Sequence, residues 1–169
     1  MQKDQLNVLA INPGSRYLGI AVFVGDELRD WAVRLVRRER IQTLIEEYIN
    51  QYGVDVIALK KFHTSRTSRE LRIIISTMER IAKKNRLALR EYSIGEVEGA
   101  LLLEKRKNKG LLMEEVAARY PFLSNELQKE KKNKNPYLIR MFETVGIGSV
   151  CVHEFDRSVR KVEKNNDER

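Results

Sequence analysis

The chain has 169 residues, 42% of them hydrophobic, and a formal net charge of +8. A chain of this length can bury a sizeable core as one domain, so we expect a single domain over residues 1–155 and a polar, frayed tail over 156–169. No apolar run approaches the roughly 20 residues that span a bilayer, and the N-terminus lacks a signal pattern, which predicts a cytoplasmic protein with no membrane partner. The single cysteine, Cys151, excludes an intrachain disulfide and a cysteine-based metal cage, and we expect a small buried side chain there.

The positive charge is concentrated in residues 60–90. This segment holds ten Lys and Arg against two Glu, whereas basic and acidic residues balance in the rest of the chain. Such a cluster favours nucleic acid as the partner, because each phosphate that a cation neutralises releases counterions. The alternative is a solvated basic helix that only keeps the protein soluble.

The sequence of the first half predicts consecutive strands, followed by helices and strands in alternation. Three extended segments joined by short turns are expected at 8–11, 17–24 and 28–36. Helices and strands then alternate over a helix from Ile41 that Gly53 ends, a strand at 54–59, a helix at 67–86 and a strand at 87–92. The three opening strands therefore form an antiparallel meander.

The second half is expected to be helical. Ser93 and Glu96 have the spacing of a capping box, which predicts a helix to about Glu104. A further helix is expected at 111–120. The lysine-rich segment 127–135 is expected to be mobile.

A last helix is expected from Pro136, since Asn135 can cap it and proline suits the first helical position. Together these segments predict an α/β protein: a mixed five-stranded sheet made of a three-strand meander and then βαβ units, flanked by helices on both faces.

This element order and the segment Ile11-Asn12-Pro13-Gly14-Ser15-Arg16 resemble the ribonuclease-H-like fold and, within it, the RuvC-type Holliday junction resolvases. The first strand of that family ends in Ile-Asp-Pro-Gly-Ser/Thr-Arg. Its fourth strand ends in Ala-Ile-Glu, similar to Ala58-Leu59-Lys60 here. Its last core helix contains Met-Phe-Asp-Ala, similar to residues 141–144 (Met-Phe-Glu-Thr), often with another acid at the position of Arg140. The resemblance covers about residues 6–150.

The resemblance implies a site where acids hold two divalent metal ions that help to cut a DNA strand. The matched positions here hold Asn12, Lys60, Arg140 and Glu143, with a summed charge of +1 instead of −4. Magnesium requires anionic oxygen ligands, and a unit-charge pair at about 4 Å and a dielectric constant near 20 is worth about 4 kcal/mol. Lys60 therefore replaces an attraction for the metal with a repulsion. We expect a degenerate nuclease site without a metal cofactor, whose basic groups hold a phosphate instead.

Further residues are expected to contact nucleic acid, most of them near the end of the fourth strand. With Lys60 they are Arg16, Lys61, Phe62, His63, Arg66, Arg69 and Arg72. Phe62 can stack on a base or belong to the core. His63 and His153 lack a metal-ligand spacing with another His or Cys, which makes a zinc site improbable.

Each matched position also has a simpler interpretation. The Asn12 side chain can bond its neighbouring backbone. Lys60 and Lys61 can be an ordinary solvated strand end. Arg140 and Glu143 are three residues apart on a helix and can pair with each other.

These observations leave three hypotheses for function. The leading one is a nuclease-deficient RuvC-like protein of DNA recombination that binds branched or structured DNA, as a homodimer through the helix at 67–86. The second is an active, Mg²⁺-dependent structure-selective endodeoxyribonuclease that recruits other acids, namely Asp26, Asp55, Glu96 or Glu98. The third is a non-enzymatic interaction partner of an intact homologue.

Overall fold

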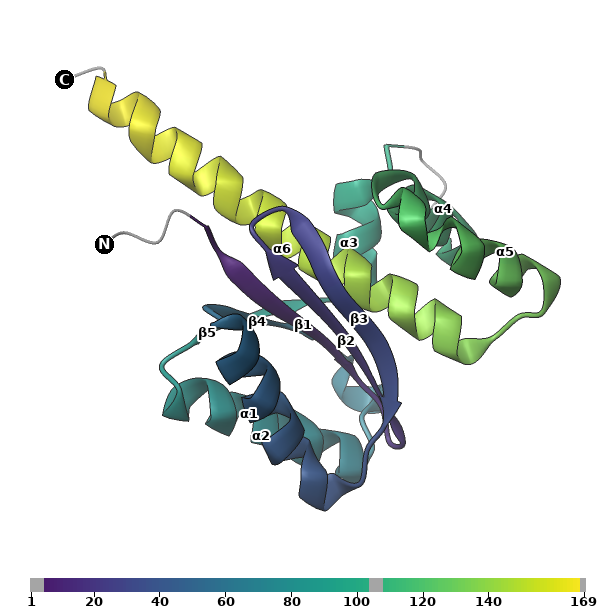
Figure 1. Cartoon of the computed structure of the whole chain (residues 1–169). Coiled ribbons are helices and arrows are strands. Elements are labelled where there is room, and N and C mark those ends of the chain that lie inside the picture. The colour runs from purple at the N-terminus through teal and green to yellow at the C-terminus, as the bar shows by residue number, and fades with distance from the viewer. Residues whose placement is uncertain (1–4, 104–107, 168–169) are drawn as a thin grey trace.

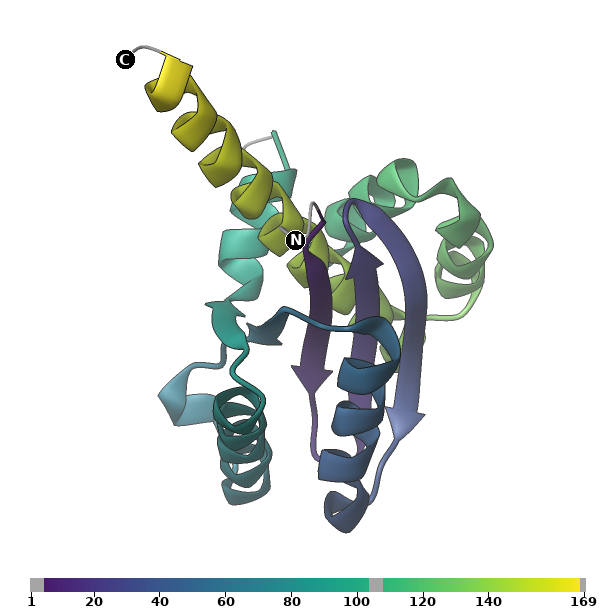
Figure 2. The same cartoon turned by 60° about the vertical axis from the view of Figure 1, so that its left-hand side comes forward.

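Five strands form one mixed sheet in the order β3-β2-β1-β4-β5 (Figures 1 and 2). The computed structural model describes residues 5–103 and 108–167. The strands are β1 (Asn7–Pro13), β2 (Tyr17–Val24), β3 (Glu27–Leu35), β4 (Val56–Lys60) and β5 (Ala88–Tyr92). Pairing is antiparallel from β1 to β3, whereas β4 runs parallel to β1 and β5 runs parallel to β4. The predicted meander and five-stranded mixed sheet are confirmed.

Helices cover both faces of the sheet, as expected (Figures 1 and 2). One face carries α1 (Ile41–Tyr52) and α2 (Arg69–Lys84). The other carries α3 (Ile94–Leu101), α4 (Lys109–Arg119), α5 (Ser124–Lys132) and α6 (Pro136–Asp167). The described residues also form three short 3-10 turns: η1 (Arg38–Arg40), η2 (Thr64–Arg66) and η3 (Pro121–Leu123).

Strand β1 lies between two apolar cores. Because successive side chains of a strand point to opposite faces, Leu9 and Ile11 pack with α1 and α2, whereas Val8 and Ala10 pack with α6. The central strand is therefore buried on both faces, and Asn12 near its end is the one polar side chain of 8–12.

Helix α6 lies close against the sheet. A Cβ added at Gly148 would overlap the ring of Phe23. Cys151, on the same helix, is buried as expected, and burial raises the pKa of its thiol. This close contact fixes the position of the helix relative to the strand ends.

The sequence-based capping box is confirmed: Ser93 and Glu96 cap α3 reciprocally. The expected continuation of this helix to about Glu104 is wrong, because α3 ends at Leu101 and the backbone of Leu102 is extended. None of the helices in the described parts of the chain is long and apolar enough to cross a membrane.

The expectation of a mobile lysine-rich segment at 127–135 is wrong. Residues 124–132 form α5, whose Leu127 is buried, so this segment is largely helical. Lysine loses little side-chain freedom in a helix, and one apolar anchor suffices to dock it.

Helix α6 continues to Asp167, through most of the polar segment 156–169. A helix already nucleated by its buried half extends at low cost through Arg, Lys and Glu. The domain bounds and the fraying of this segment stay a prediction.

Candidate functional site

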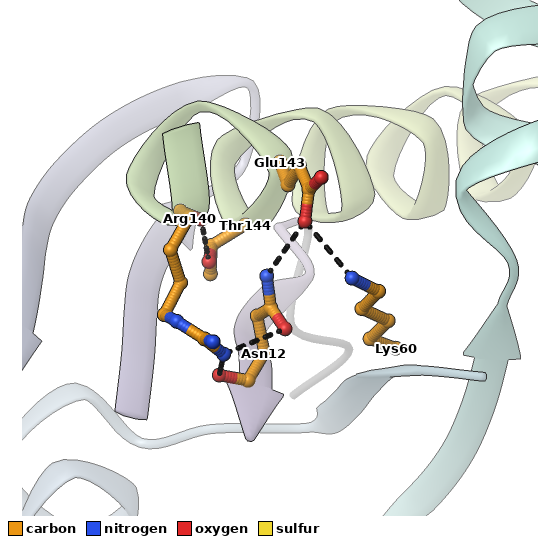
Figure 3. A network of polar contacts seen from close by, with 5 residues as sticks. All are labelled: Asn12, Lys60, Arg140, Glu143 and Thr144. Atoms are coloured by element: carbon orange, nitrogen blue, oxygen red, sulfur yellow. Dashed lines mark hydrogen bonds and ion pairs between the residues drawn. The ribbon is translucent and has the colours of Figure 1, made fainter. Parts of the chain in front are cut away.

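The ends of β1 and β4 and the first two turns of α6 bring together the four positions that the resemblance singled out. The register of β1 with β4 ends at Ile11 opposite Leu59, so Asn12 and Lys60 follow one residue later on neighbouring parallel strands. Arg140 and Glu143 face them from α6 (Figure 3). The Asn135 side chain accepts a hydrogen bond from the backbone of Tyr137 at 2.9 Å and so fixes the start of that helix.

Glu143 is the centre of the polar network. Its Oε2 accepts hydrogen bonds from Asn12 Nδ2 at 3.1 Å and from Lys60 Nζ at 2.9 Å (Figure 3). The side chains of Lys60 and Glu143 are 19% and 8% exposed, and Asn12 is fully buried. The carboxylate is thus held by a neutral amide and by an ammonium group in a largely dry environment.

Arg140 completes the network from the other side of Asn12. Its Nη1 donates to the backbone oxygen and to Oδ1 of Asn12, both at 3.4 Å. Thr144 Oγ1 donates to the backbone oxygen of Arg140 at 2.6 Å. The amide of Asn12 therefore uses its donor toward Glu143 and its acceptor toward Arg140, which a carboxylate could not do.

The simpler interpretations of these positions do not describe the geometry. Asn12 bonds side chains on α6 rather than its neighbouring backbone. Glu143 pairs with Lys60, not with Arg140, and Lys60 is not a freely solvated strand end. The four side chains meet; their participation in binding remains a prediction.

Arg140 carries the uncompensated positive charge of this site. Lys60 and Glu143 neutralise each other, whereas Arg140 forms no ion pair among the described residues and bonds only neutral oxygens of Asn12. Its guanidinium packs on the turn after β1, where a Cβ at Gly14 would lie 2.8 Å from Nη1. A cation held against a backbone turn without a carboxylate partner is suited to bind an anion.

The side chains do not fit a divalent metal. They supply one carboxylate, one amide and two cations, whereas Mg²⁺ requires anionic oxygen ligands. Within the described residues, no three His, Cys, Asp or Glu side chains are grouped so that they could hold a metal ion. The ammonium group of Lys60 lies against the carboxylate of Glu143, where a metal ion would have to bind.

The acids proposed as substitutes lie elsewhere. Asp55 accepts a hydrogen bond from the backbone of Asn7, at the opposite end of β1 from Asn12. Asp26 is in the turn between β2 and β3, at that same far end. Glu96 bonds the backbone of Ser93 to cap α3, and Glu98 follows on the same short helix. The geometry gives none of them a place in the network.

The residues expected to contact nucleic acid lie at the end of the sheet where Asn12 lies. Six of them are exposed: Arg16 after β1, Lys61, His63 and Arg66 after β4, and Arg69 and Arg72 at the start of α2. Phe62 is half-buried, with Lys60 Nζ 5.0 Å from its ring centroid. The His63 ring bonds Ser65 within its own turn, at 2.6 Å from Oγ. No observation of binding tests these assignments.

Two tyrosines beside the site escaped the sequence analysis. Tyr17 and Tyr137 pack edge to face with ring centroids 4.4 Å apart, and Tyr137 is 41% exposed. Tyr17 follows Arg16, and Tyr137 lies one helical turn before Arg140. An exposed aromatic side chain among basic residues, such as Tyr137, can be a platform on which a base stacks. The signal available in the sequence was the position of Tyr137, one helical turn before Arg140.

Gly19 of β2 allows α6 to approach Asn12. A Cβ at this position would overlap Thr144 Oγ1 and lie 3.1 Å from Arg140 Cγ and 3.2 Å from Asn12 Cβ. Thr144 cannot turn away without losing its hydrogen bond to Arg140. We expect Gly19→Ala to lower the free energy of unfolding by about 1–3 kcal/mol through overpacking, as measured by urea denaturation.

Gly95→Ala is the matched control. Gly95 is exposed on α3, and the nearest atom to an added Cβ is Ser93 Oγ at 3.9 Å. Alanine is the better helix former, so this change should be neutral or stabilising by up to about 1 kcal/mol. Equal losses of stability in the two variants would contradict the close approach of α6 to β2.

The parallel order of β1, β4 and β5, the antiparallel meander and the helix that crosses the sheet over the strand ends define the class: a ribonuclease-H-like fold. No protein-family model and no curated protein sequence matches the chain. Several solved structures do match the chain. RuvC of Thermus thermophilus has a TM-score of 0.67 at 15% identity, and the match covers 91% of this chain and 96% of that one.

Two further similar structures contain DNA. The T. thermophilus RuvC complex with a Holliday junction substrate has a TM-score of 0.65 at 15% identity, covering 91% of this chain and 96% of that one. The Fowlpox virus resolvase complex with substrate Holliday junction DNA has a TM-score of 0.57 at 10% identity, covering 89% and 99%. The chain therefore has the ribonuclease-H-like fold in its RuvC-type form, as the sequence motifs predicted.

Proposed function

We propose that this chain is a RuvC-like protein that binds branched DNA through its phosphates and has lost metal-dependent cleavage. The observation that carries the proposal is the charge of the Asn12, Lys60, Arg140 and Glu143 network. Its one carboxylate is neutralised by Lys60, and Arg140 retains a positive charge beside neutral oxygens. Such a network attracts a phosphate and repels a divalent cation.

The surroundings of the network support a polyanionic ligand. Arg16, Lys61 and Arg66 are exposed at the same end of the sheet, and α2 begins there with two further exposed arginines. The RuvC and Fowlpox resolvase structures of the same fold are complexes with Holliday junction DNA. Branched DNA is accordingly the ligand that we propose for this chain.

We extend the proposal to a homodimer through α2. Ile73 lies off the buried stripe of this helix and stays partly exposed, so an apolar side chain is free to face a second copy. The molar mass in solution, measured by light scattering, tests this part separately from DNA binding.

Binding of a four-way DNA junction, followed by fluorescence anisotropy, tests the proposed function. We expect the same affinity in EDTA as in Mg²⁺, and a loss of about 10³-fold between about 50 and 200 mM salt for some six phosphate contacts. Arg140→Gln should weaken binding, because it removes the positive charge beside Asn12 and keeps a polar side chain.

Three outcomes contradict the proposal. Binding that does not depend on salt would exclude phosphate contacts as its source. Nicking of the junction only in Mg²⁺ or Mn²⁺ would instead support an active nuclease. A protein partner that is retained in a pull-down after nuclease treatment, with no junction binding, would favour the role of interaction partner.

A further inference from the structure

We infer that a second basic surface, on the β3 side of the network, holds another arm of the same DNA. We call it the β3 surface and define it by Arg34, Arg37, Arg38 and Arg40. The inference rests on the proposed function and adds to it a contact region that lies outside the basic segment 60–90.

The β3 surface is strongly basic and open. All four arginines are exposed, and none forms an ion pair among the described residues. Arg34, Arg37 and Arg40 line a cavity of about 410 Å³ between the end of β3 and α1. Glu47 also lines it, and Glu39 lies in η1, so the four arginines still leave a positive excess.

Part of this surface is held in place by packing. The guanidinium carbon of Arg34 lies 5.8 Å from the ring centroid of Tyr48, a buried residue of α1. The turn η1 fixes the backbone, where Arg40 N donates to the oxygen of Arg37 at 2.8 Å. Leu35 is 71% exposed among the arginines. Cations positioned on a rigid backbone, with an apolar side chain between them, suit a sugar-phosphate chain.

The β3 surface is continuous with the network. The backbone nitrogen of Val36 donates to the oxygen of Arg16 at 3.2 Å, and Leu35 pairs with Tyr17. Arg16 follows the turn on which Arg140 packs. The β1–β2 turn and the end of β3 lie at the same end of the sheet (Figure 1). A DNA strand that reaches Arg140 can therefore continue across Arg16 onto the β3 surface.

The second basic group lies on the other side of the network. Lys61 and Arg66 follow β4, whereas the β3 surface follows the strand at the opposite edge of the meander. Asn12 and Arg140 stand between these two groups. A ligand with several duplex arms fits the two separated basic groups better than a single linear duplex does, because each basic group can neutralise a different arm.

The experiment measures junction affinity as a function of salt for three variants. Arg34→Gln/Arg37→Gln/Arg40→Gln removes three charges from the β3 surface. Arg37→Gln/Arg40→Gln removes two and keeps the Arg34 contact with Tyr48. The control, Arg29→Gln/Arg119→Gln/Arg157→Gln, removes three exposed charges near the β2–β3 turn, at the opposite end of the sheet and outside the segment 60–90, and so matches the change in net charge.

We expect the triple variant to bind about tenfold or more weakly near 0.1 M salt, with a slope of log affinity against log salt that is smaller by about 2–3, since each lost phosphate contact removes about 0.9. For the double variant, the slope of log affinity against log salt should be smaller by about 2. The control should bind like the wild type.

Equal binding by the triple variant and the control would overturn the inference. If the triple variant shows a lowered thermal midpoint, the double variant decides, and wild-type binding by it would likewise overturn the inference. Failure of the wild-type protein to bind the junction is a different result, because it rejects the proposed function itself.

Discussion

Replacement of Glu143 by alanine is expected to lower the free energy of unfolding by about 3 kcal/mol, because it leaves the charge of Lys60 and the amide of Asn12 without their common acceptor. Lys60 is only 19% exposed, so water replaces the carboxylate poorly. Denaturation in urea at neutral pH measures the loss. Glu79→Gln, on the exposed face of α2, is the control and should change stability by no more than about 0.5 kcal/mol.

A double-mutant cycle isolates the contribution of the ion pair itself. Lys60→Met and Glu143→Gln each remove one charge, and together they leave neither charge unpaired. We expect the double variant to be more stable than the sum of the single losses predicts, with a coupling of about 1–3 kcal/mol. Additivity within about 0.5 kcal/mol would mean that the pair at 2.9 Å contributes nothing specific.

The positions of Asn12 and Lys60 at the ends of two strands could be predicted from the sequence alone, whereas only the resemblance implied that these strands are neighbours. Both follow apolar runs that read as buried strands, and parallel neighbours end at the same edge of a sheet. Arg140 and Glu143 are about 130 positions away from Asn12. No local pattern places them there, and only the resemblance to a known family indicated that their helix crosses the strand ends.

The pairing within the network could not be predicted. Spacing on the helix allowed Arg140 to pair with Glu143, but the structure gives Glu143 to Lys60 and Arg140 to Asn12. Which partner Arg140 and Glu143 each bond depends on the direction in which the two side chains leave α6. It also depends on Gly14 and Gly19, which leave room beneath Arg140. Packing between segments that are far apart in the sequence cannot be predicted from a local sequence pattern.

The segment 124–132 illustrates a different limit. Its lysine-rich composition predicts a mobile loop, whereas the helix propensity of the same lysines favours a helix. Leu127 and the preceding Leu123 are both buried, which marks one apolar face. Two apolar positions four residues apart were the signal for α5, and they were outnumbered by the charges around them.

The second large effect concerns metal binding at the four positions of the network. The triple variant Asn12→Asp/Lys60→Glu/Arg140→Asp changes the charge of the four positions from +1 to −4, so we expect it to bind Mg²⁺ or Mn²⁺. Without metal the crowded carboxylates should destabilise the protein. A divalent ion at about 100 times its dissociation constant restores about 2.7 kcal/mol, which corresponds to a rise of about 5–10 °C in the thermal midpoint. Differential scanning fluorimetry in EDTA and in either metal measures it.

Asn12→Asp alone is the decisive comparison. The new carboxylate would replace the amide that donates to Glu143 at 3.1 Å, and it would face that acid as a like charge. Lys60 and Arg140 would remain and neutralise the two acids, so no site for a divalent ion forms. We therefore expect neither a metal-dependent rise in the midpoint nor cleavage of a four-way junction. Metal-dependent cleavage by this single variant would show that Lys60 and Arg140 do not prevent metal binding, and that the amide of Asn12 alone accounts for the loss.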